Sequence, residues 1–267
     1  MPLLIAVLAG LLIGLSLGAL GGGGSILAVP VLVYMLGQSP VAATTASLLI
    51  VGISAAAGAV AAHRRGNVYV GRGFAFALVG TAGAALGATW SVLVDPDVLL
   101  VSFAALMLVV AGVMLARRGR PSVDTQAHEP IIAVSPHFAC DCPRALKVLV
   151  TGLLVGLLTG FLGVGGGFVV VPALVLALSL GLPQAVGTSL LVIAVNSAAA
   201  FVVRLGHGVH VDWLPVVVLT VMAVAGSLLG ARVASRLPAR TLSVGFAVLL
   251  LAVAGYTAAQ SLPALVG

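Results

Sequence analysis

Two glycine-rich tracts interrupt otherwise apolar stretches of the chain, and they limit its fold more than any other feature. The first tract, 21–24 with Ser25 after it, precedes Pro30, and the second, 163–167, precedes Pro172. Glycine clusters disfavour helix, and proline removes a backbone donor. In lipid, such a break persists only where it faces protein or a water-filled cavity. Two breaks at corresponding positions therefore indicate the binding site of a transporter.

The composition is that of an integral membrane protein. The chain is 61% hydrophobic and 7% charged, with a mean hydropathy of +1.29, whereas soluble proteins carry about 25% charged residues. We expect an all-α polytopic protein in a lipid bilayer, as a multi-pass protein of a prokaryotic plasma membrane. The net charge of +6 does not indicate a nucleic-acid partner, because the basic residues lie in short loops that orient membrane proteins.

Apolar runs divide the chain into full spans and shorter segments. A full span needs roughly 20 apolar residues. The predicted spans are 3–20, 42–62, 74–94, 98–116, 146–162, 185–203, 213–231 and 242–259. The runs after the two glycine tracts, which end near Leu36 and Leu180, are too short to span and predict half-helices.

The two halves of the chain resemble each other beyond the glycine tracts, which are 142 residues apart. At that same offset, 47–49 matches 189–191 and Gly66 matches Gly208. Gly83 and Gly87 match Gly226 and Gly230 one residue further along, and these small-residue pairs predict close helix packing. We therefore predict transmembrane repeat 1 at 1–116, a polar cytoplasmic linker at 117–145, and transmembrane repeat 2 at 146–267.

Two topologies fit this duplication. If each half opens with a re-entrant hairpin and continues with three full spans, the halves are inverted. If each opening segment crosses once as a broken helix, the halves are parallel. The inverted arrangement leaves only Arg204 outside, whereas the parallel arrangement exposes Arg232, Arg236 and Arg240. The positive-inside rule favours inverted repeats. In that arrangement the cytoplasmic basic residues are Arg64, Arg65, Arg72, Arg117, Arg118, Arg120, Arg144, Lys147, Arg232, Arg236 and Arg240.

Each glycine tract has the features expected of an anion-binding site. Glycines let backbone N–H groups approach a ligand, and the start of the following helix adds partial positive charge. We expect the two tracts to converge near the bilayer midplane. The predicted backbone donors are Gly23, Gly24 and Ser25 in the first tract and Gly165, Gly166 and Gly167 in the second. The alternative is that the glycines only allow helices to cross closely.

A few polar side chains lie inside the apolar spans. Ser47 and Ser54 share a helix face, and the equivalent Ser189 and Asn196 do the same. We predict that Ser47, Thr188, Ser189 and Asn196 orient a bound anion. Hydroxyl groups can instead bond back to their own helix, but the amide of Asn196 needs partners that lipid does not offer.

Several classes of function are disfavoured. The spans show no mid-span Asp, Glu, Lys or Arg, so a relay through buried carboxylates is not expected. Ser25 has no histidine in a span to act as its base, and no nucleotide-binding motif is present. We predict no enzyme activity, no cofactor and no bound metal. The linker residues His128, His137, Cys140 and Cys142 do not have the usual zinc spacing, and we interpret them as part of a reduced loop.

The residues around the second tract resemble a known family. The segments 160–168, 171–174 and 185–190 are closely similar to the motif of the TauE/SafE sulfite-exporter family. The first-half copy differs, with Ser25 where glycine is expected and Thr45-Ala46-Ser47 in place of Gly-Thr-Ser. The resemblance implies transport, usually export, of small anions such as sulfite, thiosulfate or sulfonates.

The prediction is thus a secondary transporter that moves a small sulfur oxyanion or sulfonate by alternating access. The alternative is a non-transporting membrane scaffold, or a sulfur-relay component that uses Cys140 and Cys142. Several substrates and coupling ions fit this sequence, and a homo-oligomer is one of the oligomeric states that it allows.

Overall fold

The structure is a computed structural model of the whole chain. It describes residues 2–91, 93–94, 142–162, 167–177, 180–205 and 212–234, together with isolated positions between 102 and 112 and between 236 and 255. The helices are α1 (Pro2–Leu20), α2 (Ser25–Pro30), the π-helix η1 (Val31–Met35), α3 (Pro40–His63), α4 (Val70–Ser91), α6 (Cys142–Leu162), α7 (Gly167–Ala177), α8 (Leu182–Leu205) and α9 (Trp213–Ala234).

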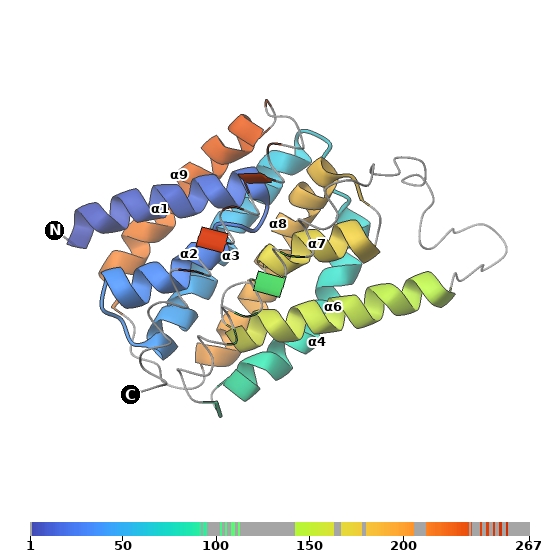
Figure 1. Cartoon of the computed structure of the whole chain (residues 1–267), viewed down its shortest axis with the longest axis horizontal. Helices are drawn as coiled ribbons and strands as arrows, with labels where there is room; N and C mark the ends of the chain where they lie inside the picture. Colours follow the sequence, from blue (N-terminus) through green and yellow to red (C-terminus); the bar gives the residue numbers. More distant parts are fainter. Residues whose placement is uncertain are drawn as a thin grey trace.

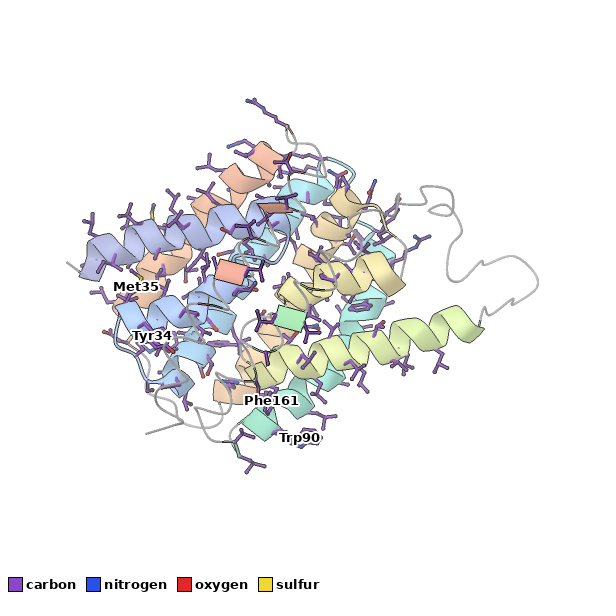
Figure 2. The ribbon with its side chains drawn as sticks, viewed as in Figure 1. Tyr34, Met35, Trp90 and Phe161 are labelled. Carbon is purple, nitrogen blue, oxygen red and sulfur yellow. The ribbon has the colours of Figure 1, made fainter. Side chains whose placement is uncertain are left out.

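The all-α membrane fold is confirmed. Five helices in the described part of the chain, α1, α3, α4, α8 and α9, are long and apolar enough to span a bilayer. Large apolar side chains such as Leu8, Leu12 and Val221 are exposed, as a lipid-facing surface requires. Figure 2 shows two further exposed side chains, those of Met35 and Trp90, at the outside of the bundle. The predicted spans 98–116 and 242–259 lie almost entirely outside the described residues.

The short helices after the glycine tracts are also confirmed, as α2 with η1 and as α7. Pro30 has no N–H group to continue the helix ladder, and the backbone after it widens into η1, where the N–H of Leu36 bonds to the carbonyl of Val31 at 3.1 Å. α3 then begins with Pro40 in its first turn and with Ser39 as its N-cap. The segment from α1 to η1 is therefore a helical hairpin.

Glycines bring helices from opposite halves into close contact. α1 packs along α9 and α6 packs along α4 (Figure 1). A Cβ added at Gly226 would lie 2.5 Å from the Leu11 carbonyl, and one at Gly87 would lie 2.7 Å from the Phe161 nitrogen. Gly83 and Gly230 make equivalent approaches, so the predicted packing role of both glycine pairs is confirmed. Figure 2 shows Phe161 and Trp90 at the same end of the α4–α6 pair.

The centre of the bundle is formed by α3 and α8, which run antiparallel. Gly52 lies against Ser197, and Gly58 lies against Leu190. These two helices are equivalent in the sequence comparison of the halves. Equivalent helices in parallel halves would run in the same direction, so the antiparallel contact favours the inverted arrangement. The duplication itself stays a prediction from the sequence.

With the exception of Arg204, the lysine and arginine residues of the described segments gather at one end of the bundle. The C-terminal ends of α3 and α9 lie side by side at this end. Arg65 donates to the carbonyl of Ala231, and Ser227 donates to the carbonyl of Ser54. α4 and α6, which run parallel, both begin at this end. The basic residues at this end are Arg64, Arg65, Arg72, Arg144, Lys147, Arg232 and Arg236. Arg204, near the last residue of α8, lies at the opposite end, as the inverted topology predicts.

This topology predicts that His63 and Asp212 lie on opposite sides of the membrane. Both side chains are exposed at helix ends. In a Cys140→Ser, Cys142→Ser background, His63→Cys should resist a membrane-impermeant maleimide in intact cells, because it lies at the arginine-rich end. Asp212→Cys should be labelled rapidly. Labelling of both cysteines from the same side would instead indicate parallel halves.

Candidate functional site

The first glycine tract forms a buried turn that begins at Gly21. Gly21 has a φ of +70°, and its N–H bonds to the carbonyl of Leu17 at 2.8 Å, so it ends α1 in the left-handed conformation that glycine adopts most easily. The hydroxyl of Ser25 donates to the Gly22 carbonyl at 2.7 Å. Among the described residues, no backbone carbonyl accepts from the N–H groups of Gly22, Gly23 or Gly24. This turn therefore carries donors that an anion could use.

The two glycine tracts meet at Gly22 and Gly167. A Cβ added at Gly22 would overlap the Gly167 carbonyl, and one added at Gly167 would lie 2.7 Å from the Gly22 Cα. The main chains of the two breaks are thus in direct contact, beside Ile193 of α8. Ile193 lies near the middle of the 24 residues of α8, so the contact is well inside the bundle. Gly165 and Gly166 lie outside the described residues.

Ser189 connects α8 to the first tract. Its buried hydroxyl lies 2.5 Å from the Gly21 carbonyl and 2.7 Å from the carbonyl of Val186 in its own helix. Of the side chains predicted to orient the anion, Ser189 is the one for which the structure shows a hydrogen bond to a glycine tract. It fixes the position of the turn relative to α8.

Replacing Ser189 with alanine should lower the free energy of unfolding by about 1 kcal/mol, the usual net value of one such hydrogen bond. The expected loss exceeds that for Thr89→Ala, because the Thr89 hydroxyl is exposed and bonds only to Leu86 in its own helix. Thermal unfolding of the purified protein measures both. Equal losses in the two variants would show that the bond to Gly21 does not hold the turn.

Asn196 is the buried polar residue with the most unusual surroundings. Its side chain is 0% exposed, and neither amide atom has a hydrogen-bond partner in the described structure. It lies against Gly80 of α4, where an added Cβ would be 2.7 Å from the amide nitrogen. The hydroxyl of the next residue, Ser197, is likewise buried and without a partner in the described structure. Leaving a buried polar group unsatisfied costs about 1–3 kcal/mol, so these groups are available to a ligand or to water.

The hydrogen bonds described for the other predicted side chains run to other parts of the bundle. Thr188 lies against Gly73 of α4, and its hydroxyl oxygen accepts the N–H of Tyr69, the residue before α4, at 3.1 Å. The Ser47 hydroxyl donates to the Thr44 carbonyl of its own helix at 2.8 Å. Ser54 bonds within α3 in the same way, to Ile50. The hydroxyls of Ser47 and Ser54 therefore make bonds within their own helix, which was the alternative interpretation of these residues.

The sequence analysis was wrong about the position of Arg204. It placed Arg204 in an external loop, whereas the structure includes it in α8, where the side chain is only 4% exposed. Its Nη1 lies 2.5 Å from the Thr44 hydroxyl and its Nη2 lies 3.2 Å from the Gly160 carbonyl. The available signal was a single arginine that directly follows an apolar run, with no second basic residue beside it. The burial depends on α3 and α6, which hydropathy does not reveal.

The linker predictions cannot be placed in the fold. His128, His137 and Cys140 lie outside the described residues, and Cys142 is the first residue of α6. Within the described segments, no group of three or more His, Cys, Asp or Glu residues could hold a metal ion.

Comparison with known proteins assigns the chain to a family. The family model for the sulfite exporter TauE/SafE matches residues 6–257. A probable membrane transporter protein of Xylella fastidiosa (strain Temecula1 / ATCC 700964) is 35% identical over 99% of this chain and 98% of its own length. The probable membrane transporter protein YunE of Bacillus subtilis (strain 168) is 29% identical over 91% of this chain and 92% of its own length. No solved structure matches the chain. The chain therefore belongs to the TauE/SafE sulfite exporter family of membrane transporters.

Proposed function

We propose that this protein is a secondary transporter that exports a small anion, a sulfur oxyanion or sulfonate, by alternating access. The observation that carries this proposal is the contact between the glycine tracts at Gly22 and Gly167, inside the bundle. Irregular backbone at that depth is tolerated in membrane proteins where it lines a binding site. Family membership supports the sulfur-containing class of substrate.

The proposed site holds its substrate mainly with main-chain donors. The N–H groups of Gly23 and Gly24 supply donors from the first half, and that of Ser25, which bonds to the Gly22 carbonyl at 3.2 Å in the structure, would have to exchange this acceptor for the anion. Gly165, Gly166 and Gly167 supply the donors from the second half. Asn196 lies one helical turn beyond Ile193, which touches Gly167, so its amide can donate to an oxyanion from α8. Ser189 supports the site from α8 through its bond to Gly21. Thr188 and Ser47 lie on the same central helices, α8 and α3, and the hydrogen bonds described for them run to Tyr69 and Thr44 rather than to a tract. Such a site recognises a negative charge with backbone N–H groups and helix ends, and it needs no charged side chain.

The membrane potential can drive this export. Moving one negative charge out of a cell gains about 2.3 kcal/mol per 100 mV. Alternating access would then be a rocking of one group of helices against the other about the joined tracts. Two helix pairs, α1 with α9 and α4 with α6, each join one helix from the first half to one from the second. These pairs provide two such groups.

Flux in proteoliposomes tests the proposal. Liposomes loaded with labelled sulfite, thiosulfate or a small sulfonate are given a potassium diffusion potential of either sign. We expect protein-dependent efflux of at least one of these anions, faster when the lumen is negative. Efflux equal to that of protein-free liposomes for all three anions, at both polarities, would refute the proposal.

A further inference from the structure

The first turns of α8 are held from two different sides. Toward the first tract, a Cβ added at Gly21 would lie 2.7 Å from the Val186 Cα, and the Ser189 hydroxyl lies 2.5 Å from the Gly21 carbonyl. The two residues between them, Gly187 and Thr188, instead contact the segment that joins α3 to α4 and the start of α4. At 3.6 residues per turn, these two pairs lie on opposite sides of a helix. Thr188 therefore lies on a different side of α8 from the first tract.

Thr188 completes the start of α4. α4 begins at Val70, and the carbonyl of the preceding residue, Tyr69, accepts the N–H of Gly73 at 2.8 Å, so Tyr69 is the N-cap. The N–H of an N-cap residue can bond to a side chain three residues later, but that residue is Arg72, whose guanidinium has only donors. The buried hydroxyl of Thr188 accepts this N–H at 3.1 Å. Thr188 thus joins α8 directly to the first turn of α4.

α4 and α8 meet along one seam, which contains both Thr188 and Asn196. A Cβ added at Gly73 of α4 would lie 2.8 Å from the Thr188 Cγ2, and one at Gly80 would lie 2.7 Å from the Asn196 amide nitrogen. Seven residues separate the two glycines and eight separate the two polar residues, and each spacing is about two helical turns. The helices therefore run parallel, and the position of α8 at Thr188 sets where Asn196 lies against α4.

The first half of the chain lacks both of these polar groups. In the sequence comparison of the halves, Ala46 is equivalent to Thr188, and Ser54 is equivalent to Asn196. Ala46 is buried in α3, which is a complete helix from Pro40 to His63. The corresponding helix start thus forms with alanine at this position. The hydroxyl of Thr188 is present in the half that carries the amide, which connects the two residues.

We propose that Thr188 is a positioning residue of the anion site. By accepting the N–H of Tyr69, its hydroxyl fixes α8 to α4 at the start of the seam, so that the amide of Asn196 is held where it donates to the anion. Thr188 itself does not touch the anion. This inference rests on the proposed transport function, and it gives Thr188 a different role from the direct contact predicted from the sequence.

The first test compares the KM for sulfite among variants of Thr188. Valine keeps the shape of threonine without an acceptor, and alanine copies Ala46 in case valine hinders folding. We expect Thr188→Val and Thr188→Ala to raise the KM about fivefold, the ratio that corresponds to one lost hydrogen bond. Thr188→Ser keeps the acceptor and should stay within about twofold. An unchanged KM without the hydroxyl, or the same rise with serine as with valine, would overturn the inference.

Thr220→Val is the matched control. Thr220 is a buried threonine of α9 whose hydroxyl donates to the Val216 carbonyl of its own helix. The same substitution there removes a hydroxyl without separating two helices, and the KM should stay within about twofold of the wild type. A rise equal to that of Thr188→Val would show that the loss of any buried threonine hydroxyl has this effect, and would contradict a positioning role.

A double-mutant cycle separates positioning from direct contact. If Thr188 acts through Asn196, then Thr188→Val should change the KM of Asn196→Leu by less than about twofold, because the group that it positions is already gone. A further fivefold rise in that background would mean that Thr188 contacts the anion itself, and would refute the positioning role.

Hydrogen–deuterium exchange gives a readout that does not depend on transport. The amide of Tyr69 should exchange at least about threefold faster in Thr188→Val than in the wild type, and at the wild-type rate in Thr188→Ser. Wild-type exchange at Tyr69 in Thr188→Val would show that Thr188 does not hold this N–H, and would overturn the inference. Absence of wild-type flux for every anion tested would instead refute the proposed function, whatever the exchange at Tyr69.

Discussion

Replacing Gly22 with alanine should abolish anion flux and destabilise the protein. The new Cβ would overlap the carbonyl of Gly167 and lie 2.8 Å from its Cα, and neither atom belongs to a side chain that could move away. The two tracts would have to separate, and overpacking of this kind costs about 1–3 kcal/mol. A shift of about 1 Å in a site can cost on the order of 100-fold in rate. Sulfite efflux and thermal unfolding measure the two effects.

Gly71→Ala is the matched control for that substitution. Gly71 lies in the first turn of α4, and an added Cβ there meets nothing within 4 Å. Alanine favours helix over glycine by about 1 kcal/mol, so this variant should transport normally and be at least as stable as the wild type. Normal flux in Gly22→Ala would show that the contact between the tracts is not needed for transport.

Replacing Asn196 with leucine should separate function from stability. Leucine has the same branching as asparagine but no polar atoms, so the variant loses two buried groups that have no partner in the described structure. Each such group costs about 1–3 kcal/mol, and the free energy of unfolding should therefore stay the same or rise. Sulfite flux should fall about tenfold or more, because the amide no longer donates to the anion.

Ser197→Ala is the control for this experiment. It removes a neighbouring buried hydroxyl that also has no partner in the described structure, and Ser197 is not among the predicted ligands. We expect unchanged flux and equal or higher stability. Wild-type flux in Asn196→Leu would remove Asn196 from the site, and a large loss of stability would show that the amide has a structural partner.

The helices, and the glycines at which they pack closely, follow from local features of the sequence. Hydropathy and length identify the spans, and glycine with proline marks where α1 gives way to α2 and η1. The pairs Gly83 with Gly87 and Gly226 with Gly230 predict close packing because only small side chains allow backbones to approach in lipid. Which helices pack against each other could not be predicted, since the pairing of α1 with α9 joins residues about 200 positions apart.

The candidate site could be predicted only in outline. The sequence indicates that both tracts belong to one site, but it does not single out Gly22, whose importance arises from the backbone of Gly167 in the other half. Ser189 was predicted from its repeat position, and its bond to Gly21 agrees with a role at the tract. Arg204 was placed in a loop because hydropathy treats an arginine at the edge of an apolar run as a boundary. Its burial comes from contacts with Thr44 and Gly160, which are remote in the sequence.

Hydrogen–deuterium exchange of the glycine tracts, with and without substrate, tests the central claim most directly. If main-chain N–H groups hold the anion, saturating sulfite should slow exchange in peptides that contain 21–25 and 163–167. Exchange in α9 should not change. Equal exchange rates at both tracts with and without sulfite, in a preparation that transports sulfite, would contradict an anion site built from these backbone groups.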